Sequence, residues 1–170
     1  TNKVYIGDCF DVLKTFPSES IDMCITSPPY WGLRDYGVNT QLGLEKTPEQ
    51  FIDKLCDVFD EVKRVLKPNG SCWVNLGDSY HRGTRDSVPK QKGIKEVGYK
   101  YEFNHKKKYG DYYRPKSLIQ IPSRFSIEMT NRGWILRNEI IWHKPSCLPA
   151  SVKDRFTVDF EKMFFFTKNP

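Results

Sequence analysis

Apolar and polar positions alternate in blocks along this chain of 170 residues. Five short apolar runs have the length and composition of β-strands, and they cover residues 4–6, 21–26, 71–76, 134–142 and 163–166. The run at 21–26 is continuous, as expected for a strand that is buried on both faces. Segments with helical spacing lie between these runs, at residues 9–16, 47–66 and 122–132. Strands that alternate with helices predict an α/β layered sheet with about five strands.

The clearest predicted helix begins after Thr47. Thr47 is a suitable N-cap, Pro48 occupies the first helical position, and Gln50 completes a capping box. Apolar residues then recur with helical spacing at positions 51, 55, 58, 59, 62, 65 and 66. The segment 68–70 (Pro-Asn-Gly) is expected to end this helix before the strand at 71–76 begins.

Three polar turns each follow a predicted strand. They are Gly7-Asp8, the segment 27–30 and Gly77-Asp78. In α/β sheets, ligands bind at the carboxyl ends of the strands. We therefore expect these three turns to face one crevice.

The second of these turns lies in the stretch ITSPPYWGLRDYG, residues 25–37. Pro28 and Pro29 have no backbone N–H and a fixed φ, so the turn is stiff. The Ser27 hydroxyl and the Pro28 carbonyl can both accept hydrogen bonds, which suits a planar exocyclic amine whose nitrogen becomes positive as it reacts. Tyr30 and Trp31 offer flat faces against which a flipped base could stack.

The positive charge of the chain is concentrated in one segment. The formal net charge is +6, and residues 81–116 contain 11 Lys and Arg against 4 Asp and Glu. This segment also contains six Tyr and Phe residues and the run Lys106-Lys107-Lys108. Such a composition favours an insertion that binds a polyanion. A solvated loop is the alternative interpretation.

The turn at 26–31 (TSPPYW) resembles the motif [D/N/S]-P-P-[Y/F/W] of amino-group DNA methyltransferases. Further segments resemble that family in the same order, at residues 6–10, 66–71, 142–145, 154–156 and 161–168. The resemblance covers nearly the whole chain. It implies a Rossmann-like, S-adenosyl-methionine-dependent methyltransferase sheet that acts on a flipped base in double-stranded DNA.

The resemblance also implies roles for individual residues. The catalytic set is Ser27, Pro28, Pro29 and Tyr30, and the cofactor-binding set is Asp8, Cys9, Phe10 and Ser27. The expected DNA contacts are Trp31, Lys106, Lys107, Lys108 and Arg155. Alternatives stay open for some of these residues: Asp8 could instead cap the following helix, Phe10 could belong to the core, and Arg155 could pair with Glu161.

One part of the family pattern is absent from the 170 residues. The Gly-rich D-P-F-x-G-x-G segment, which holds the methionine part of the cofactor in this family, has no counterpart here. In the permuted class that begins with the catalytic half, the Gly-rich half comes later. We therefore expect residues 1–170 to be the N-terminal, catalytic part of a methyltransferase domain, with residues 81–116 inserted in it for DNA contact or target recognition.

The target base is only partly indicated. Ser at the first position of the motif favours N4 of cytosine, and N6 of adenine is the alternative within the family. A methyltransferase acting on a protein glutamine amide and a non-catalytic nucleic-acid-binding subunit are two further hypotheses. Ser27, Trp31 and the basic segment weigh against the first hypothesis, and the intact sequence from Ser27 to Trp31 weighs against the second.

Composition limits the remaining classes. The five cysteines form no C-x-x-C pair and the three histidines form no group, so neither disulfides nor a metal site is expected. We see no leader sequence, and no apolar run is long enough to cross a membrane. These features predict a cytoplasmic protein. The resemblance implies that it is prokaryotic or phage-encoded and associated with the nucleoid. Its expected protein partner is a second copy or a cognate restriction endonuclease.

Overall fold

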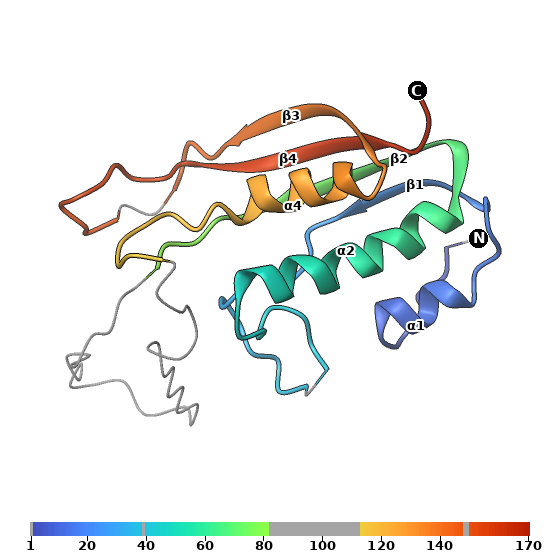
Figure 1. Cartoon of the computed structure of the whole chain (residues 1–170), viewed down its shortest axis with the longest axis horizontal. Helices are drawn as coiled ribbons and strands as arrows, with labels where there is room; N and C mark the ends of the chain where they lie inside the picture. The colour runs from blue at the N-terminus through green and yellow to red at the C-terminus, as the bar shows by residue number, and fades with distance from the viewer. Residues whose placement is uncertain (1, 39, 82–112, 148–149) are drawn as a thin grey trace.

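The computed structural model describes residues 2–38, 40–81, 113–147 and 150–170. Its elements are α1 (Cys9–Lys14), β1 (Ile21–Thr26), α2 (Pro48–Val65), β2 (Leu66–Leu76), α4 (Ile121–Asn131), β3 (Ile135–His143) and β4 (Phe160–Thr167) (Figure 1). The predicted α/β class is confirmed. Among the described residues, no helix is both long and apolar enough to cross a membrane.

The four strands form one mixed sheet in the order β1-β2-β4-β3. β1 and β2 run parallel, whereas β4 is antiparallel to both β2 and β3. Leu76 at the end of β2 lies opposite Lys162 near the start of β4. The carboxyl ends of β1 and β2 and the beginning of β4 therefore meet at one edge of the sheet.

Helices α2 and α4 lie side by side along one face of this sheet (Figure 1). As predicted, Thr47 caps α2 by accepting a hydrogen bond from the Gln50 amide at 3.2 Å. The core lies between the helices and the sheet, where Phe125 of α4 packs edge-on against Phe59 of α2 and Phe166 of β4. All three rings are buried, and aromatic residues of this size contribute much of the energy of such a core.

The opposite face of the sheet has a different character. Trp73 of β2 and Phe165 of β4 stack on it, with ring centroids 4.3 Å apart. Near them, Met23 and Ile25 of β1 are exposed, Ile25 by 64%. The prediction that β1 is buried on both faces is therefore wrong, because α2 and α4 cover only one face.

Three other predictions require correction. Residues 4–6 form no strand, since no described strand offers them hydrogen bonds, and Val4 and Ile6 are 92% and 96% exposed. The described residues thus contain four strands and not five. The segment 68–70 does not separate α2 from the strand but lies inside β2. The pairing of β2 with β1 shifts register there, between the partners of Ile21 and Met23.

Candidate active site

The Ser-Pro-Pro-Tyr turn (residues 27–30) begins directly after the last residue of β1. Backbone hydrogen bonds hold the loop that follows the turn, one from the Leu33 amide to the Tyr30 carbonyl at 3.3 Å and one from the Gly32 amide to the Gly43 carbonyl at 2.7 Å. Ser27 is exposed, whereas Pro28 is buried and Tyr30 is half-buried. An open pocket of about 360 Å³ adjoins the turn, and it is lined by Ser27, Pro28, Pro29, Tyr30, Leu33, Arg34 and Tyr36.

The Tyr30 side chain crosses from this turn to the ends of the neighbouring strands. Its hydroxyl oxygen lies 3.0 Å from a carboxylate oxygen of Glu161, 2.9 Å from the Asn75 amide nitrogen and 3.3 Å from the Ser27 hydroxyl. A Cβ atom added to Gly77 would lie 2.5 Å from the Tyr30 ring, so only glycine leaves room for the ring there. Two of the three predicted turns, at residues 27–30 and 77–78, thus meet in one place.

Glu161 is charged where it meets Tyr30. Its carboxylate forms an ion pair with Lys144 and accepts a hydrogen bond from Asn75 at 2.7 Å. Burial raises the pKa of Glu161, but Lys144, Asn75 and Tyr30 outweigh burial and lower this pKa overall. Burial, together with the adjacent carboxylate, raises the pKa of Tyr30, which therefore remains a neutral phenol.

The third predicted turn plays a different part. The Asp8 Oδ1 atom accepts a hydrogen bond from the Phe10 amide at 2.9 Å, so Asp8 caps α1. The Lys14 ammonium group lies over the Phe10 ring at 3.9 Å, and Cys9 is exposed. Within the described residues, no hydrogen bond or ion pair joins Asp8, Cys9 or Phe10 to the Ser-Pro-Pro-Tyr turn.

Trp31 does not offer a face to a base in this structure. Its side chain is only 3% exposed and belongs to the core, and its indole N–H donates to the Glu45 carbonyl at 3.1 Å. The structure therefore gives no support to a DNA contact at Trp31, which stays a prediction. The loop that follows the turn folds back as far as Glu45 and encloses the ring, which the position of Trp31 beside Tyr30 does not reveal.

Of the other expected DNA contacts, the structure describes Arg155 but not the three lysines. The Arg155 guanidinium group lies 3.6 Å from the centroid of the Tyr80 ring, while Glu161 pairs with Lys144. The predicted Arg155–Glu161 pair is therefore wrong, and the role of Arg155 in DNA binding stays a prediction. Lys106, Lys107 and Lys108 lie outside the described residues, as does most of the basic segment 81–116.

The segment after β2 connects the site to α4. Asp78 accepts hydrogen bonds from the Ser79 amide at 2.8 Å and from the Ile121 amide at 3.0 Å. Its carboxylate therefore satisfies backbone groups at the start of α4, and burial raises its pKa. Within the described parts of the chain, no group of His, Cys, Asp or Glu side chains is arranged to hold a metal ion.

Comparison with known proteins assigns this arrangement to a family. A family model described as a DNA methylase, of the N6 and N4 type, matches residues 21–170. The chain belongs to this DNA methylase family. Among its relatives, type II methyltransferase M.Cfr9I of Citrobacter freundii is 41% identical and M.SmaI of Serratia marcescens is 40% identical, each over 98% of this chain. The chain spans about half of their length, 54% and 56% respectively.

Solved structures of other proteins have the same fold as this member of the DNA methylase family. The PvuII DNA methyltransferase, described as cytosine-N4-specific, superposes with a TM-score of 0.64 at 25% identity over 97% of this chain and 48% of its own. The Thermus thermophilus protein TTHA0409, in complex with S-adenosyl-L-methionine, gives a TM-score of 0.61 at 23% identity over 97% of this chain and 54% of its own. The second likeness supports the fold alone.

Sequence analysis gave no role to two further residues of the candidate site. Asn75 is a polar residue inside an apolar strand run, and Lys144 follows Trp142-His143 in a loop. A buried amide within a strand needs hydrogen-bond partners, so Asn75 was a signal that could have been used. Nothing in the sequence around Lys144 indicates that it pairs with Glu161.

Proposed function

We propose that this protein transfers a methyl group from S-adenosyl-methionine to the exocyclic N4 amine of a flipped cytosine in double-stranded DNA. The observation that carries this proposal is the rigid Ser-Pro-Pro-Tyr turn beside an open pocket at the carboxyl end of β1. Ser at the first position of the turn supports cytosine N4 over adenine N6. So does the cytosine-N4-specific description of the PvuII enzyme, which shares the fold.

The chemistry assigned to the turn is acceptance of amine hydrogens. The lone pair of an exocyclic amine is delocalised into the base, so the amine is a poor nucleophile. The Ser27 hydroxyl and the Pro28 carbonyl accept hydrogen bonds from the N–H groups of the amine as positive charge develops on its nitrogen. These hydrogen bonds lower the barrier to methyl transfer. S-adenosyl-methionine, when bound, would supply the methyl group from its sulfonium and leave as the neutral thioether, and the methylated amine would release one proton to solvent. The Tyr30 ring supports the base by stacking.

The start of α1 and its N-cap Asp8 are proposed to hold the adenine end of the cofactor. Asp8 uses Oδ1 to cap α1, and no described residue bonds to its Oδ2, so this oxygen can accept an adenine N–H. Cys9 is exposed beside it, and the Phe10 ring offers an apolar surface that is only partly covered by Lys14. These residues fit the cofactor, although they make no hydrogen bond to the catalytic turn.

Replacing Asp8 with asparagine separates its two roles. Asparagine still caps helices well, so α1 should stay intact, whereas the loss of the carboxylate should weaken the hydrogen bond to the adenine amine. We expect cofactor affinity to fall by about tenfold, since a hydrogen bond to a charged group is worth roughly 1.5–3 kcal/mol. Calorimetric titration measures this change, with Asp11→Asn on the same helix as the matched control. Equal cofactor affinity for the wild type and Asp8→Asn would leave Asp8 as a helix cap only.

The basic segment 81–116 is proposed to lie along the DNA, with Arg155 contributing from the loop before β4. Replacing Lys106, Lys107 and Lys108 with alanine should weaken binding to all DNA sequences alike, because phosphate contacts position the duplex without reading it. The slope of log K against log salt should become shallower by about 0.9 for each phosphate that the variant no longer neutralises.

A salt titration of DNA binding measures this slope for the wild type and the triple variant. The matched control replaces Lys14, Lys46 and Lys67, which lie on α1 and next to the two ends of α2. If the slope changes equally in both triple variants, or in neither, Lys106, Lys107 and Lys108 do not contact phosphates and the segment is a solvated loop.

Nucleoside mass spectrometry tests the proposed function itself. The intact protein is incubated with DNA and S-adenosyl-methionine carrying a labelled methyl group. N4-methylcytosine is the expected product, and N6-methyladenine would move the assignment to the other base that this family methylates. Label found only in added protein, or no transfer despite cofactor binding, would refute DNA methylation.

The two relatives are named as type II methyltransferases, which supports a role for this protein in a restriction–modification system. The proposed partner in that system is the cognate endonuclease or a second copy of the chain.

A further inference from the structure

The hydrogen bonds around Tyr30 have a fixed direction. An Asn75 amide nitrogen can only donate, and the charged Glu161 carboxylate can only accept. The Tyr30 O–H must therefore donate to Glu161 at 3.0 Å, and its oxygen accepts from Asn75 at 2.9 Å. The Ser27 hydroxyl, 3.3 Å away, can then join this network only as a donor to Tyr30.

The orientation of the Asn75 amide is determined by the same contacts. Its nitrogen lies 2.7 Å from the Glu161 carboxylate, and the reverse orientation would place an oxygen against that negative charge. Asn75 is only 7% exposed, and its Oδ1 atom is buried without a hydrogen-bond partner among the described residues. A cluster that served stability alone would gain nothing from an unpaired buried oxygen, which costs free energy.

The direction of this chain of hydrogen bonds matters for Ser27. When the Ser27 proton points at Tyr30, both lone pairs of its oxygen remain for other donors, such as an amine in the pocket. If Tyr30 instead donated to Ser27, one of those lone pairs would be occupied. The carboxylate at the far end of the chain therefore controls how well Ser27 can accept.

We infer that Glu161, held by Lys144 and Asn75, is a positioning residue that fixes the direction of the hydrogen-bond chain from Ser27 through Tyr30 and so keeps the Ser27 oxygen free to accept. This inference rests on the proposed function, because it gives Ser27 the role of amine acceptor. The cluster around Tyr30 joins four separate segments: the turn after β1, the strand β2, the start of β4 and the loop after β3.

Replacing Glu161 with glutamine is the most direct test. A glutamine amide can donate to the Tyr30 oxygen, which allows the chain to reverse, while the side chain keeps its shape. Single-turnover methyl transfer at saturating cofactor should fall by about tenfold or more, since hydrogen bonding preorganised for the transition state is lost. Cofactor affinity should stay unchanged.

The matched control is Glu139→Gln. Glu139 pairs with Lys162 on the same sheet, as Glu161 pairs with Lys144, but it makes no hydrogen bond to Tyr30 or Ser27. If Glu139→Gln slows methyl transfer as much as Glu161→Gln does, the effect is structural and the inference fails. Thermal melting of both variants shows whether each is folded.

A double variant distinguishes positioning from packing. In Tyr30→Phe the chain of hydrogen bonds is already broken, so adding Glu161→Gln should lower the rate no further. Rate losses that instead multiply would show that Glu161 acts independently of Tyr30, which would overturn the inference. Because Tyr30→Phe keeps the ring, this comparison does not depend on loss of stacking.

Proton binding provides a second readout. Lys144→Met removes the positive charge that holds Glu161 ionised, so the pKa of Glu161 should rise and the acidic limb of the rate profile should move to higher pH. Lys144→Arg should restore the wild-type profile. Among the described residues, the titratable groups that contact Glu161 are Lys144 and Tyr30. The neighbouring His143–Asp159 pair is tested by Asp159→Asn, which should leave the acidic limb in place.

Nuclear magnetic resonance tests the network without turnover. The Cζ signal of labelled Tyr30 should shift as Glu161 titrates, and in Lys144→Met this shift should occur at higher pH. A Tyr30 signal that does not follow Glu161 would overturn the inference even if the protein methylates DNA. Coupled titration in a protein that transfers no methyl group to DNA would instead support the network and refute the proposed function.

Discussion

Replacing Ser27 with alanine is expected to lower the rate of methyl transfer by roughly 10² to 10³, the usual cost of removing one preorganised group that stabilises charge in a transition state. Ser27 is exposed at the pocket beside the turn, and its side chain makes one hydrogen bond within the described residues, to Tyr30. Its removal therefore leaves the core intact. The Pro28 carbonyl remains as an acceptor, so we expect residual activity and not complete loss.

Single-turnover kinetics on DNA measure the loss, and cofactor titration should give a largely unchanged affinity, because the proposed contacts of Asp8, Cys9 and Phe10 with the cofactor remain. Ser20→Ala is the matched control, because Ser20 lies at the opposite end of β1 and donates a local hydrogen bond to the Pro17 carbonyl at 2.7 Å. Wild-type turnover in Ser27→Ala would show that another group accepts the amine hydrogens. The assignment of catalysis to the turn would then be wrong.

The local features of this chain could be predicted from sequence. The start of α2 is set by residues next to one another, Thr47, Pro48 and Gln50, and the structure has the expected cap. The stiffness of the turn after β1 is also local, because it comes from two adjacent prolines. Chemistry that depends on one short segment can be deduced from that segment.

Features that depend on distant partners could not be predicted in this way. Residues 4–6 have the composition of a strand, but a strand forms only where a neighbour offers hydrogen bonds. Trp31 lies next to Tyr30 in sequence, yet the loop to Glu45 buries it. The contact between Tyr30 and Glu161 joins residues 131 positions apart, so it is set by the antiparallel entry of β4 beside β2.

The candidate site therefore combines two kinds of information. The turn supplies the groups proposed to meet the substrate, and these groups belong to consecutive residues of the sequence. The ends of β2 and β4 and the loop after β3 supply the carboxylate, amide and ammonium groups that orient them. Glu161 meets Tyr30 and Lys144 only because the fold brings distant segments together, so its role could be inferred only from the structure.

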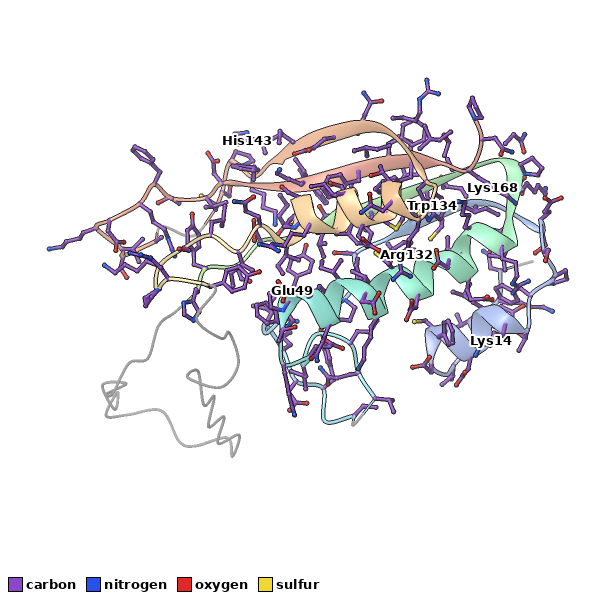
Figure 2. All side chains as sticks on the ribbon, in the orientation of Figure 1. Lys14, Glu49, Arg132, Trp134, His143 and Lys168 are labelled. Atoms are coloured by element: carbon purple, nitrogen blue, oxygen red, sulfur yellow. The ribbon has the colours of Figure 1, made fainter. Side chains whose placement is uncertain are left out.

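Stability of the helical layer should depend strongly on Arg132, which follows α4. Its side chain is 18% exposed, and its guanidinium group pairs with Asp53, Asp57 and Asp60 of α2 and with Glu128 of α4 (Figure 2). Replacing Arg132 with methionine should lower the free energy of unfolding by about 2 kcal/mol, because four carboxylates lose their shared partner and then repel one another. Arg137→Met on β3 is the matched control, since Arg137 forms no ion pair with the described residues.

Salt and pH distinguish this electrostatic contribution from packing. Added salt should narrow the gap between the wild type and Arg132→Met, because screening weakens both the ion pairs and the repulsion that follows their loss. Arg132 lowers the pKa of Glu128, so the stability from this pair is present above the ordinary pKa of a carboxyl group and is lost as the pH falls through the lowered value. Urea unfolding at several pH values measures the difference. A gap that persists unchanged in strong acid and in high salt would show that Arg132 stabilises the helices by packing and not by charge.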